Sequence, residues 1–438
     1  MTRPITIRDP LWDTIRLEAD ACRIVDSQVF QRLRHIRQLG HAHLVYPGAT
    51  HTRFDHAVGV YHLAQRALAL LSERGALGDL SDSECRIIPL AALLHDIGHY
   101  PFSHALEELE EGRIPGHHEA LAGRFLADAE VRAALAGLGE DAVGQIELLI
   151  CGRSDHPLQG LVSGSLDLDK IEYLKRDATF CGVPYGVVDV DRLLHALQVL
   201  KDPETGLSEV GVHEKGIASL ESLLFAKYQM FRNVYWHHAV RAATVLYKRI
   251  IADALEQKLI EPEELVGQTD EGILFVLEQR TRGGAGSDAG ALVQALRTRK
   301  LPKRAGEVVA AELADPEAGS WLVVDSPLKR AAEDRVAEEI GLPAGGAYLD
   351  FPEKRAMFHL NLLVQRRDGG VLRIGPGGRT GLIGITRVAE ELYHTARVLR
   401  LFTWPERREV RPAALAQLAA RSAAEVRQRL ASGAALLG

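Results

Sequence analysis

An imidazole and a carboxylate stand side by side at the end of an apolar run in the first quarter of the chain. The run 90–94 leads into His95 and Asp96, and His56 and Asp169 lie near the ends of two other predicted helices. Burying such a pair is costly unless another group pairs with it, so an ion pair at a helix end is the simplest interpretation. A divalent cation would satisfy all four side chains, and mixed nitrogen and oxygen ligands suit Mn, Mg, Fe, Zn or Ni. We therefore predict a metal site at these four residues.

Basic side chains accompany the residues of this predicted metal site. A bound metal ion can lower the pKa of a water molecule and polarise a phosphoryl oxygen. Arginine offers phosphate two parallel hydrogen bonds, lysine a point charge and histidine a proton, so these residue types suit a polyphosphate. The candidates for such contacts are Arg53, His99, His104, His118, Lys170 and Lys227.

Helices are the elements that would position these residues. Apolar residues recur at helical spacing through most of the first 260 positions. In one predicted helix Asp169, Tyr173 and Asp177 recur every four residues and so share a face, and Gly182 stops that helix. The predicted helices lie at about 26–40, 54–73, up to 95–96, from 118, within 121–150, at 165–180 and at 215–258.

The two ends of the chain depart from this helical pattern. Residues 5–18 alternate and are broken by Asp9-Pro10, which predicts a short hairpin or an extended arm. Beyond Pro302 a period of two indicates strands, including a hairpin at Asp368-Gly369-Gly370. The other expectations are a loop at 280–290, strands at 320–325, 359–365 and 371–374, a glycine turn at 375–381, and helices at 388–402 and 412–436.

We predict a mainly α-helical protein with a smaller α+β lobe at its C-terminal end. A chain of 438 residues is too long for one compact core, so two or three domains are expected. The predicted divisions are an N-terminal arm or hairpin at 1–29, a helical core at 30–260, a helical connector at 261–318 and the α+β lobe at 319–438.

Composition narrows the classes of function. Hydrophobic residues are 46% and charged residues 25% of the chain, as in ordinary globular proteins, and the net charge of −7 gives no general attraction to nucleic acid or anionic membranes. The four cysteines are widely spread, which argues against a disulfide framework. Neither an apolar leader nor a membrane-spanning run is found, so we expect a cytoplasmic protein.

The order of these motifs resembles that of the HD phosphohydrolase superfamily. More narrowly, the chain resembles deoxynucleoside triphosphate triphosphohydrolases of the SAM-and-HD-domain type, although it has no SAM domain. The resemblance implies an HD-domain helical core, keeps its order from about residue 5 to 245 and fades after about 260. The matching stretches are 30–40, 51–59, 94–104, His118-Glu119, 167–177 and 228–241.

This resemblance implies a reaction in which a dNTP and water give a deoxynucleoside and inorganic triphosphate. His104, oriented by Glu107, would act as the general acid or base at the α-phosphate, while His99 and His118 would contact phosphate oxygens. The divalent metal ion would be held by His56, His95, Asp96 and Asp169.

The resemblance also implies substrate contacts. Arg53, Lys170 and Lys227 would neutralise the triphosphate. Tyr173 and Asp177, together with Gln38, would hold the sugar 3′-hydroxyl. Leu39 and Tyr235 would crowd C2′ and select deoxyribose, because an apolar wall leaves a 2′-hydroxyl without a partner. The full set is Gln38, Leu39, Arg53, Lys170, Tyr173, Asp177, Lys227 and Tyr235. The family often has arginine where this chain has Lys227, which would exchange a two-pronged phosphate contact for a point charge.

A regulatory site is the least complete part of the resemblance. Asp26, Gln31 and Arg34 match positions that read a guanine base between subunits in relatives, which implies a GTP or dNTP activator and a homodimer or homotetramer. The N-terminal arm that would complete this site is matched only at Asp9-Pro10. Whether the chain needs an activator stays open at this point.

Two other classes of function also stay open. The four metal residues suit other HD hydrolases equally well, such as phosphomonoesterases, cyclic-nucleotide or (p)ppGpp hydrolases and nucleases. The basic face at 31–37 and the unassigned C-terminal lobe suit a non-catalytic nucleotide sensor or a nucleic-acid-binding scaffold. Lys170 with Tyr173, and Leu39 with Tyr235, favour the triphosphohydrolase.

Overall fold

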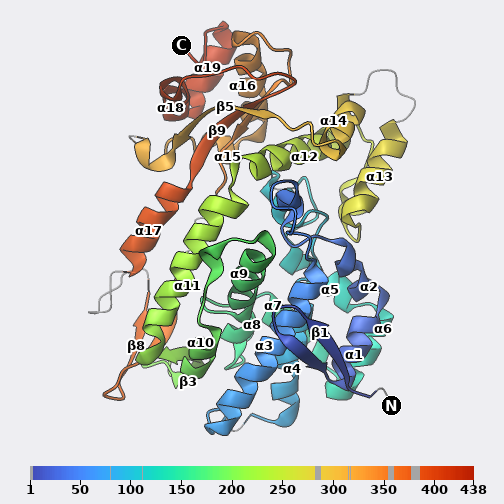
Figure 1. Cartoon of the computed structure of the whole chain (residues 1–438), viewed down its shortest axis with the longest axis vertical. Coiled ribbons are helices and arrows are strands. Elements are labelled where there is room, and N and C mark those ends of the chain that lie inside the picture. The colour runs from blue at the N-terminus through green and yellow to red at the C-terminus, as the bar shows by residue number, and fades with distance from the viewer. Residues whose placement is uncertain are drawn as a thin grey trace.

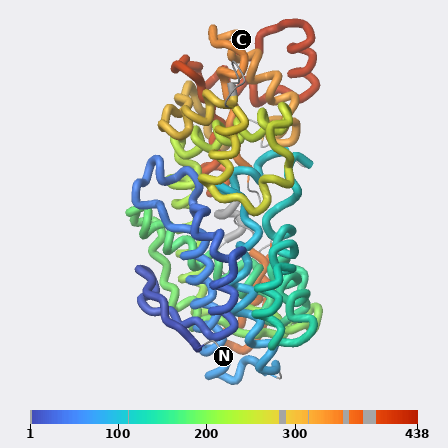
Figure 2. Tube along the Cα trace, turned by 90° about the vertical axis from the view of Figure 1, so that its right-hand side faces the viewer, coloured from blue at the N-terminus to red at the C-terminus, as the bar shows by residue number. Residues whose placement is uncertain are grey.

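The computed structural model describes residues 3–78, 80–110, 112–281, 288–313, 315, 317–353, 360–375 and 385–438. The protein is mainly α-helical, as predicted, and has a smaller sheet-containing lobe toward its C-terminus. Figures 1 and 2 show the two termini at opposite ends of the molecule. Three predicted features fall at least partly outside the described residues, namely the loop at 282–287, His359 and the glycine turn from 376.

The N-terminal hairpin is confirmed. Strands β1 (Ile5–Asp9) and β2 (Asp13–Leu17) pair in antiparallel fashion. The Asp9 carboxylate closes the turn by accepting hydrogen bonds from the backbone nitrogens of Leu11 and Trp12. This turn directs the Trp12 side chain into the helical core.

Helices form the core between the hairpin and the lobe. Two of them begin with capping boxes, Thr52 with Asp55 and Ser81 with Glu84, which fix where α3 and α4 start. Gly182 ends α9 in the left-handed conformation, with φ of +67°. In chain order the helices are α1 (Ala19–Asp26), α2 (Gln28–Gln31), α3 (Arg53–Glu73), α4 (Asp82–Leu94), α5 (His118–Leu126), α6 (Ala129–Leu135), α7 (Ala142–Ile150), α8 (Gln159–Val162), α9 (Leu168–Cys181), α10 (Val190–Ala196), α11 (Ile217–Met230), α12 (His238–Glu256), α13 (Asp270–Thr281) and α14 (Asp288–Arg297).

The single helix predicted at 26–40 is wrong. Asp26 ends α1 instead of starting a helix, and α2 passes into a short 3₁₀ helix that stops at Ile36. The chain is extended there because Arg37 forms a β-bridge with Thr52. Pairing with a distant segment thus overrides the local helical pattern.

The long helix predicted at 215–258 is interrupted. α11 passes into a π-helical turn at Phe231–Tyr235 before α12 begins. A π-turn contains one residue more than an α-turn and so rotates the side chains that follow. Phe231 and Trp236 pack here with Tyr393 in a separate aromatic cluster.

The strand predicted at 320–325 is also wrong. These residues include the short helix α15 (Trp321–Val324), and Asp325 caps the helix that follows. Trp321 and Leu322 are buried in succession rather than alternately, so the period of two in the sequence does not correspond to a buried face.

The helix predicted at 388–402 ends early. Helix α17 (Ile385–Ala396) is followed by strand β9 (Val398–Thr403). Leu399, Leu401 and Phe402 are all buried, so this strand lacks the alternation that would identify it in the sequence.

β9 is the central strand of the antiparallel sheet in the C-terminal lobe, with strand order β5–β9–β6. This sheet and its helices enclose an apolar core of their own. The elements of the lobe are β5 (Lys303–Val309), α16 (Ser326–Glu339), β6 (Ala347–Asp350), α18 (Pro412–Ala420) and α19 (Ala423–Ser432).

A second sheet returns late residues to the helical core. Its strand order is β3–β4–β7–β8, in which β7 and β8 form the predicted hairpin and β7 runs parallel to β4. Their bounds are β3 (Leu197–Lys201), β4 (Ser208–His213), β7 (Leu362–Gln365) and β8 (Val371–Ile374). β5 lies within the predicted connector and β7 within the predicted lobe, so the sheets cross the domain boundaries predicted from the sequence.

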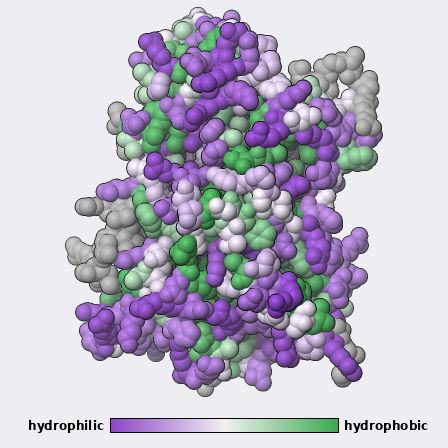
Figure 3. Space-filling view, viewed as in Figure 1, coloured by the Kyte–Doolittle hydropathy of each residue, from purple (hydrophilic) through white to green (hydrophobic). Residues whose placement is uncertain are grey.

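The surface is largely polar. On the face shown in Figure 3, hydrophilic residues cover much of both ends, and apolar residues lie in smaller patches between them. All four cysteines are free, in keeping with their wide spacing. Among the described helices, none combines the length and the apolar character needed to cross a bilayer.

Candidate functional site

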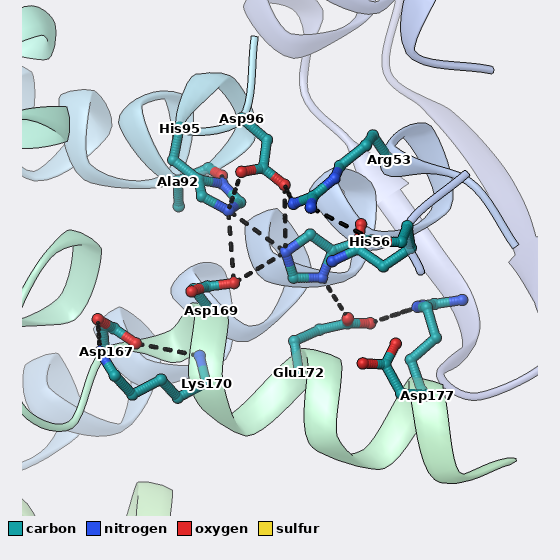
Figure 4. Close-up of polar contacts among 12 residues, drawn as sticks. Arg53, His56, Ala92, His95, Asp96, Asp167, Asp169, Lys170, Glu172 and Asp177 are labelled. Atoms are coloured by element: carbon teal, nitrogen blue, oxygen red, sulfur yellow. Dashed lines mark hydrogen bonds and ion pairs between the residues drawn. The ribbon is translucent and has the colours of Figure 1, made fainter. Parts of the chain in front are cut away.

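His56, His95, Asp96 and Asp169 converge on one point (Figure 4). They come from the first turn of α3, the end of α4 and the first turn of α9. His56 Nε2 lies 2.9 Å from Asp169 Oδ1 and 3.3 Å from His95 Nε2, and His95 Nε2 lies 3.4 Å from Asp96 Oδ1. Ligands bound at about 2.1 Å in an octahedron stand about 3 Å apart, so this spacing suits one metal ion.

Hydrogen bonds on the far side of the two imidazoles decide which ring nitrogen faces the centre. His56 Nδ1 lies 2.7 Å from Glu172 Oε2, and His95 Nδ1 lies 2.8 Å from the Ala92 carbonyl oxygen. In a neutral ring Nδ1 must then carry the proton, so each Nε2 presents a lone pair. Two lone pairs and two carboxylates that face one another need a cation between them, so these residues fit a metal ion.

The same arrangement attracts a proton. Burial lowers the pKa of His56, but hydrogen bonds with Asp169 and Glu172 outweigh burial and raise the pKa to about 10. Burial raises the pKa of Asp96, yet the charges of Arg53 and His95 hold it well below its usual range. The centre therefore favours bound positive charge.

Arg53 is buried beside this centre. Its Nη1 lies 2.5 Å from Asp96 Oδ2, and its Nε donates a hydrogen bond to Ser103 Oγ over 3.0 Å. Arg53 thus orients Asp96 and connects it to the segment that carries His104. In this structure the arginine predicted to neutralise a triphosphate pairs with Asp96, one of the four predicted metal ligands.

Glu172 links the N-terminal hairpin to the metal centre, and the sequence did not identify it. Besides His56, its carboxylate accepts hydrogen bonds from Trp12 Nε1 over 2.9 Å and from Arg176 Nε over 2.7 Å. Arg176 Nη2 also lies 3.0 Å from Asp9 Oδ2 in the hairpin. Its place three residues after Asp169, on the same face of α9, was the available signal.

Replacing Gly59 with alanine is expected to disturb this support. Gly59 lies on α3, and a Cβ added there would stand 2.1 Å from Glu172 Oε1 and 2.9 Å from Arg176 Nη2. Because both neighbours are fully buried, we expect the unfolding free energy to fall by about 1–3 kcal/mol and metal affinity to fall about 10–100-fold. Thermal unfolding and metal titration would measure the two effects.

Gly137→Ala provides the matched control, because an added Cβ there meets no atom within 4 Å. It should leave both quantities nearly unchanged. Equal behaviour of the two variants would contradict a role for Glu172 in holding His56.

A second group of side chains adjoins the metal centre. Glu107 Oε2 lies 2.7 Å from His104 Nδ1, and Glu107 Oε1 lies 2.6 Å from His118 Nδ1. The rings of His99 and His118 are stacked with centroids 3.8 Å apart, and His99 Nε2 lies 3.1 Å from Asp96 Oδ1. A continuous series of polar side chains therefore runs from the metal centre to His104.

Glu107 gives this group its charge. Burial raises the pKa of Glu107, but the neighbouring His118 and His104 outweigh burial and hold the pKa well below its usual range. Burial likewise lowers the pKa of His118, whereas Glu107 raises it more. The His104 side chain is 49% exposed, and its Nδ1 is engaged by a carboxylate, so Nε2 is the nitrogen suited to exchange a proton with a substrate.

The backbone is strained where this group begins. Residues Ser103–Glu108 form a 3₁₀ helix, here called the His104 segment, and Phe102 and Ser103 before His104 have φ of +56° and +58°. Such left-handed residues cost about 1–3 kcal/mol each and need support from their surroundings. Asp270 Oδ1 accepts a 2.6 Å hydrogen bond from the Phe102 nitrogen, and Ser103 Oγ donates to the Arg37 carbonyl over 2.8 Å.

Asp270 is expected to make stability depend on pH. Burial raises its pKa to about 6, and hydrogen bonds from the Arg37 and Phe102 nitrogens offset this only in part. Because the folded protein binds this proton more tightly than the unfolded chain, the stabilisation is complete below about pH 4 and is lost as pH rises through 6. Relative to Asp270→Asn, the wild-type unfolding free energy should fall by about 2 kcal/mol between pH 4 and pH 7.

Urea unfolding of the two proteins at several pH values would measure this difference. The asparagine variant keeps the size of the side chain and removes its titration. If the two stability curves run parallel from pH 4 to pH 7, Asp270 does not titrate in this range.

The residues predicted to hold the sugar lie together. Tyr235 donates a 2.6 Å hydrogen bond to Asp177 Oδ2, His51 Nε2 lies 2.8 Å from Asp177 Oδ1, and the rings of Tyr173 and Tyr235 are 6.4 Å apart. The backbone nitrogen of Gln38 donates a hydrogen bond to the backbone carbonyl of His51 over 3.0 Å. Gln38 Oε1 is buried without a hydrogen-bond partner among the described residues, so it could accept a hydrogen bond from a bound ligand.

The structure also describes the surroundings of three other residues of the predicted set. Lys170 pairs with Asp167 and donates to the Gly164 carbonyl over 2.7 Å, so its ammonium group is engaged at the start of α9. Leu39 packs against a small apolar cluster that includes Val240. Lys227 is buried on α11.

Asp26, Gln31 and Arg34 lie on the N-terminal segment. Asp26 is exposed, Arg34 Nε donates to Gln31 Oε1 over 2.8 Å, and the Arg34 guanidinium lies 3.4 Å from the centre of the Phe54 ring. The basic face predicted here is not continuous, because Arg32 turns inward and donates to backbone carbonyls of residues 97 and 99.

Comparison with known families agrees with this geometry. The HD domain model matches residues 53–154, which include three of the four residues at the metal centre, and the HD associated region model matches residues 188–374. The chain belongs to the HD phosphohydrolase superfamily. Within this HD protein, the His104 segment lies in the first match and Asp270 in the second.

Relatives of this HD protein include both uncharacterised and named proteins. An uncharacterised protein of Methanocaldococcus jannaschii is 32% identical over 271 residues, which are 62% of this chain and 54% of the relative. The deoxynucleoside triphosphate triphosphohydrolase SAMHD1 of Bos taurus is 28% identical over 265 residues, covering 53% of this chain and 44% of that protein. The chain thus spans about half the length of the curated relatives it matches.

Solved structures match almost the whole chain. A hypothetical protein from Aquifex aeolicus is 26% identical with a TM-score of 0.69, covering 91% of this chain and 96% of that one. A phosphohydrolase from Bacteroides thetaiotaomicron is 23% identical with a TM-score of 0.70, covering 91% and 99% respectively, and shows the shared fold alone.

Proposed function

We propose that this protein is a metal-dependent triphosphohydrolase that converts a dNTP and water into a deoxynucleoside and inorganic triphosphate. The observation that carries the proposal is the juxtaposition of a four-residue metal centre with a histidine held by a carboxylate, His104 with Glu107. The 28% identity to a relative named as a deoxynucleoside triphosphate triphosphohydrolase supports the choice of substrate.

Different residues of the chain would have different roles in this reaction. A divalent metal ion held by His56, His95, Asp96 and Asp169 would polarise the α-phosphate and lower the pKa of an attacking water. The water oxygen bonds to the α-phosphorus and loses a proton, while the bond between the α-phosphorus and the 5′ oxygen breaks and the 5′ oxygen gains a proton. His104 exchanges that proton while Glu107 keeps its ring oriented, and the buried carboxylate stabilises the protonated ring.

The sugar would lie at the other side of the centre. Tyr173 and Asp177 would hold the 3′-hydroxyl, with Gln38 as a further partner, while Leu39 and Tyr235 would crowd C2′. The aromatic and apolar side chains beside them give a 2′-hydroxyl no partner, which disfavours ribonucleotides by at most about 10²-fold.

The decisive experiment identifies the products. Metal-loaded protein would be incubated with each dNTP, with and without GTP, and tripolyphosphate and orthophosphate would be separated and quantified. Tripolyphosphate with free deoxynucleoside is the expected result. Orthophosphate from nucleoside monophosphates, with triphosphates untouched, would instead assign the protein to another class of HD hydrolase.

Nucleotide activation belongs to the same proposal. Asp26, Gln31 and Arg34 are the residues proposed to contact a GTP or dNTP activator between copies of the chain. Sedimentation with and without GTP tests this part, since the activator should raise the oligomeric state together with the hydrolysis rate. A GTP-independent rate at constant mass would remove activation from the proposal.

A further inference from the structure

Arg241 connects the His104 segment with the C-terminal lobe. Its Nη1 and Nη2 each lie 2.7 Å from a carboxylate oxygen of Glu108. Its Nε lies 2.9 Å from Asp350 Oδ2, and Nη2 lies 2.6 Å from Asp350 Oδ1. One guanidinium thus binds two carboxylates, each through two hydrogen bonds.

The three partners come from different parts of the fold. Glu108 directly follows Glu107 in the His104 segment, Arg241 lies in the first turn of α12, and Asp350 is the last residue of β6. Figure 1 shows α12 between the helical core and the lobe. Lys248, which lies about two turns after Arg241 on α12, forms a further ion pair with Glu108 over 2.7 Å.

Burial gives this contact its rigidity. The side chains of Arg241 and Asp350 are 4% and 1% exposed, so water cannot readily replace either partner. The planar guanidinium offers its donors in a fixed fork, and using both edges of that fork fixes the two carboxylates relative to each other. A displacement of Asp350 is therefore passed to Glu108, and from there to the adjoining residue that holds His104.

We propose that Asp350, Arg241 and Glu108 are positioning residues through which the C-terminal lobe sets the orientation of His104 and Glu107. The inference rests on the proposed function in assigning proton transfer to His104. Residues 53–154 of the HD domain match contain His104, Glu107 and Glu108 but neither Arg241 nor Asp350. The HD domain match alone consequently contains His56, His95 and Asp96 of the metal centre and the whole His104 segment, but not the two residues that hold Glu108.

The test compares two buried carboxylates of the lobe. Asp350→Ala removes one of the two carboxylates that bind Arg241, and Glu333→Ala removes the carboxylate that binds Arg249, which lies further along the same helix α12 and pairs with Glu333. Asp350→Ala leaves Arg241 with Glu108, whereas Glu333→Ala removes the carboxylate that pairs with Arg249 and also accepts a hydrogen bond from the Leu349 nitrogen, so the loss of stability in the control should be at least as large.

Only Asp350→Ala should alter catalysis. We expect its kcat to fall about 10–100-fold, because misplacement of a catalytic group by 1 Å has effects of this size, while KM and metal content stay at wild-type values. Hydrogen exchange of the backbone amides at 103–109 should accelerate in Asp350→Ala and not in Glu333→Ala. Asp350→Asn, which keeps the shape and an acceptor oxygen, should lie between wild type and Asp350→Ala in both measurements.

Two results would overturn the inference. One is an equal loss of kcat in Asp350→Ala and Glu333→Ala. The other is unchanged exchange at 103–109 in both aspartate variants. If the wild-type protein hydrolyses no phosphate ester, the proposed function fails, yet the exchange measurements still decide whether the lobe holds the segment. Should Asp350→Ala not fold, Asp350→Asn against Glu333→Gln gives the same comparison.

Discussion

Asp96→Asn is expected to lose its metal and with it at least about 10³-fold in kcat/KM, which corresponds to several kcal/mol of transition-state stabilisation. Asp96 faces His56 and His95 at the metal centre, where Oδ1 lies 3.4 Å from His95 Nε2 and Oδ2 pairs with Arg53. Loss of a residue that merely orients a ligand costs about 10–100-fold in metal affinity, so loss of a ligand costs more. Elemental analysis and metal titration measure affinity, and product formation measures turnover.

The asparagine keeps the size of the side chain and an oxygen that Arg53 can approach, so the protein should remain folded. Asp55→Ala is the control, because Asp55 lies on α3 next to His56 but serves in the capping box with Thr52. It should lose about 1 kcal/mol of stability and retain its metal. Full metal content in Asp96→Asn would refute the proposed ligand set.

His104→Ala should separate chemistry from metal binding. We expect kcat to fall about 10²–10⁴-fold, the usual contribution of a general acid or base, while metal content stays unchanged. The reason is geometric, since His104 pairs with Glu107, which is not one of the four residues of the metal centre. Rates under saturating dNTP and metal analysis of the same preparations provide the measurement.

His117→Ala is the matched control for this variant. His117 is a neighbouring histidine whose side chain is 74% exposed and 4.0 Å from Glu107 Oε1. Its removal should leave kcat close to the wild-type value. Comparable rates in His104→Ala and wild type would exclude His104 as the proton-transfer group.

The group of residues that meets at the candidate metal centre could be predicted because each member carries a local signal. His95 and Asp96 are adjacent at the end of an apolar helix, and Asp169 follows a capping residue. The mainly helical fold and the N-terminal hairpin follow from local periodicity in the same way. Strand β9 and the end of the helical segment at Ile36 do not follow from local periodicity. Each depends on pairing with another segment of the chain, β9 with β5 and Arg37 with Thr52.

The contacts that orient the site were harder to predict for the same reason. Arg241 and Asp350 are 109 positions apart, and Trp12 and Glu172 are 160 positions apart. Nothing in the residues beside them indicates that they meet. The strained backbone at Phe102 and Ser103 was likewise hidden, since neither residue type favours the left-handed conformation.

A centre assembled from α3, α4 and α9 can bind a metal ion tightly only when these helices are packed together. Each tenfold excess of free metal over its dissociation constant then adds about 1.4 kcal/mol to the folded state. The melting temperature of a preparation is consequently a gauge of its metal content. In a cell, the same coupling would make the amount of this protein follow the supply of metal, because molecules that fail to load would be the first to unfold and be degraded.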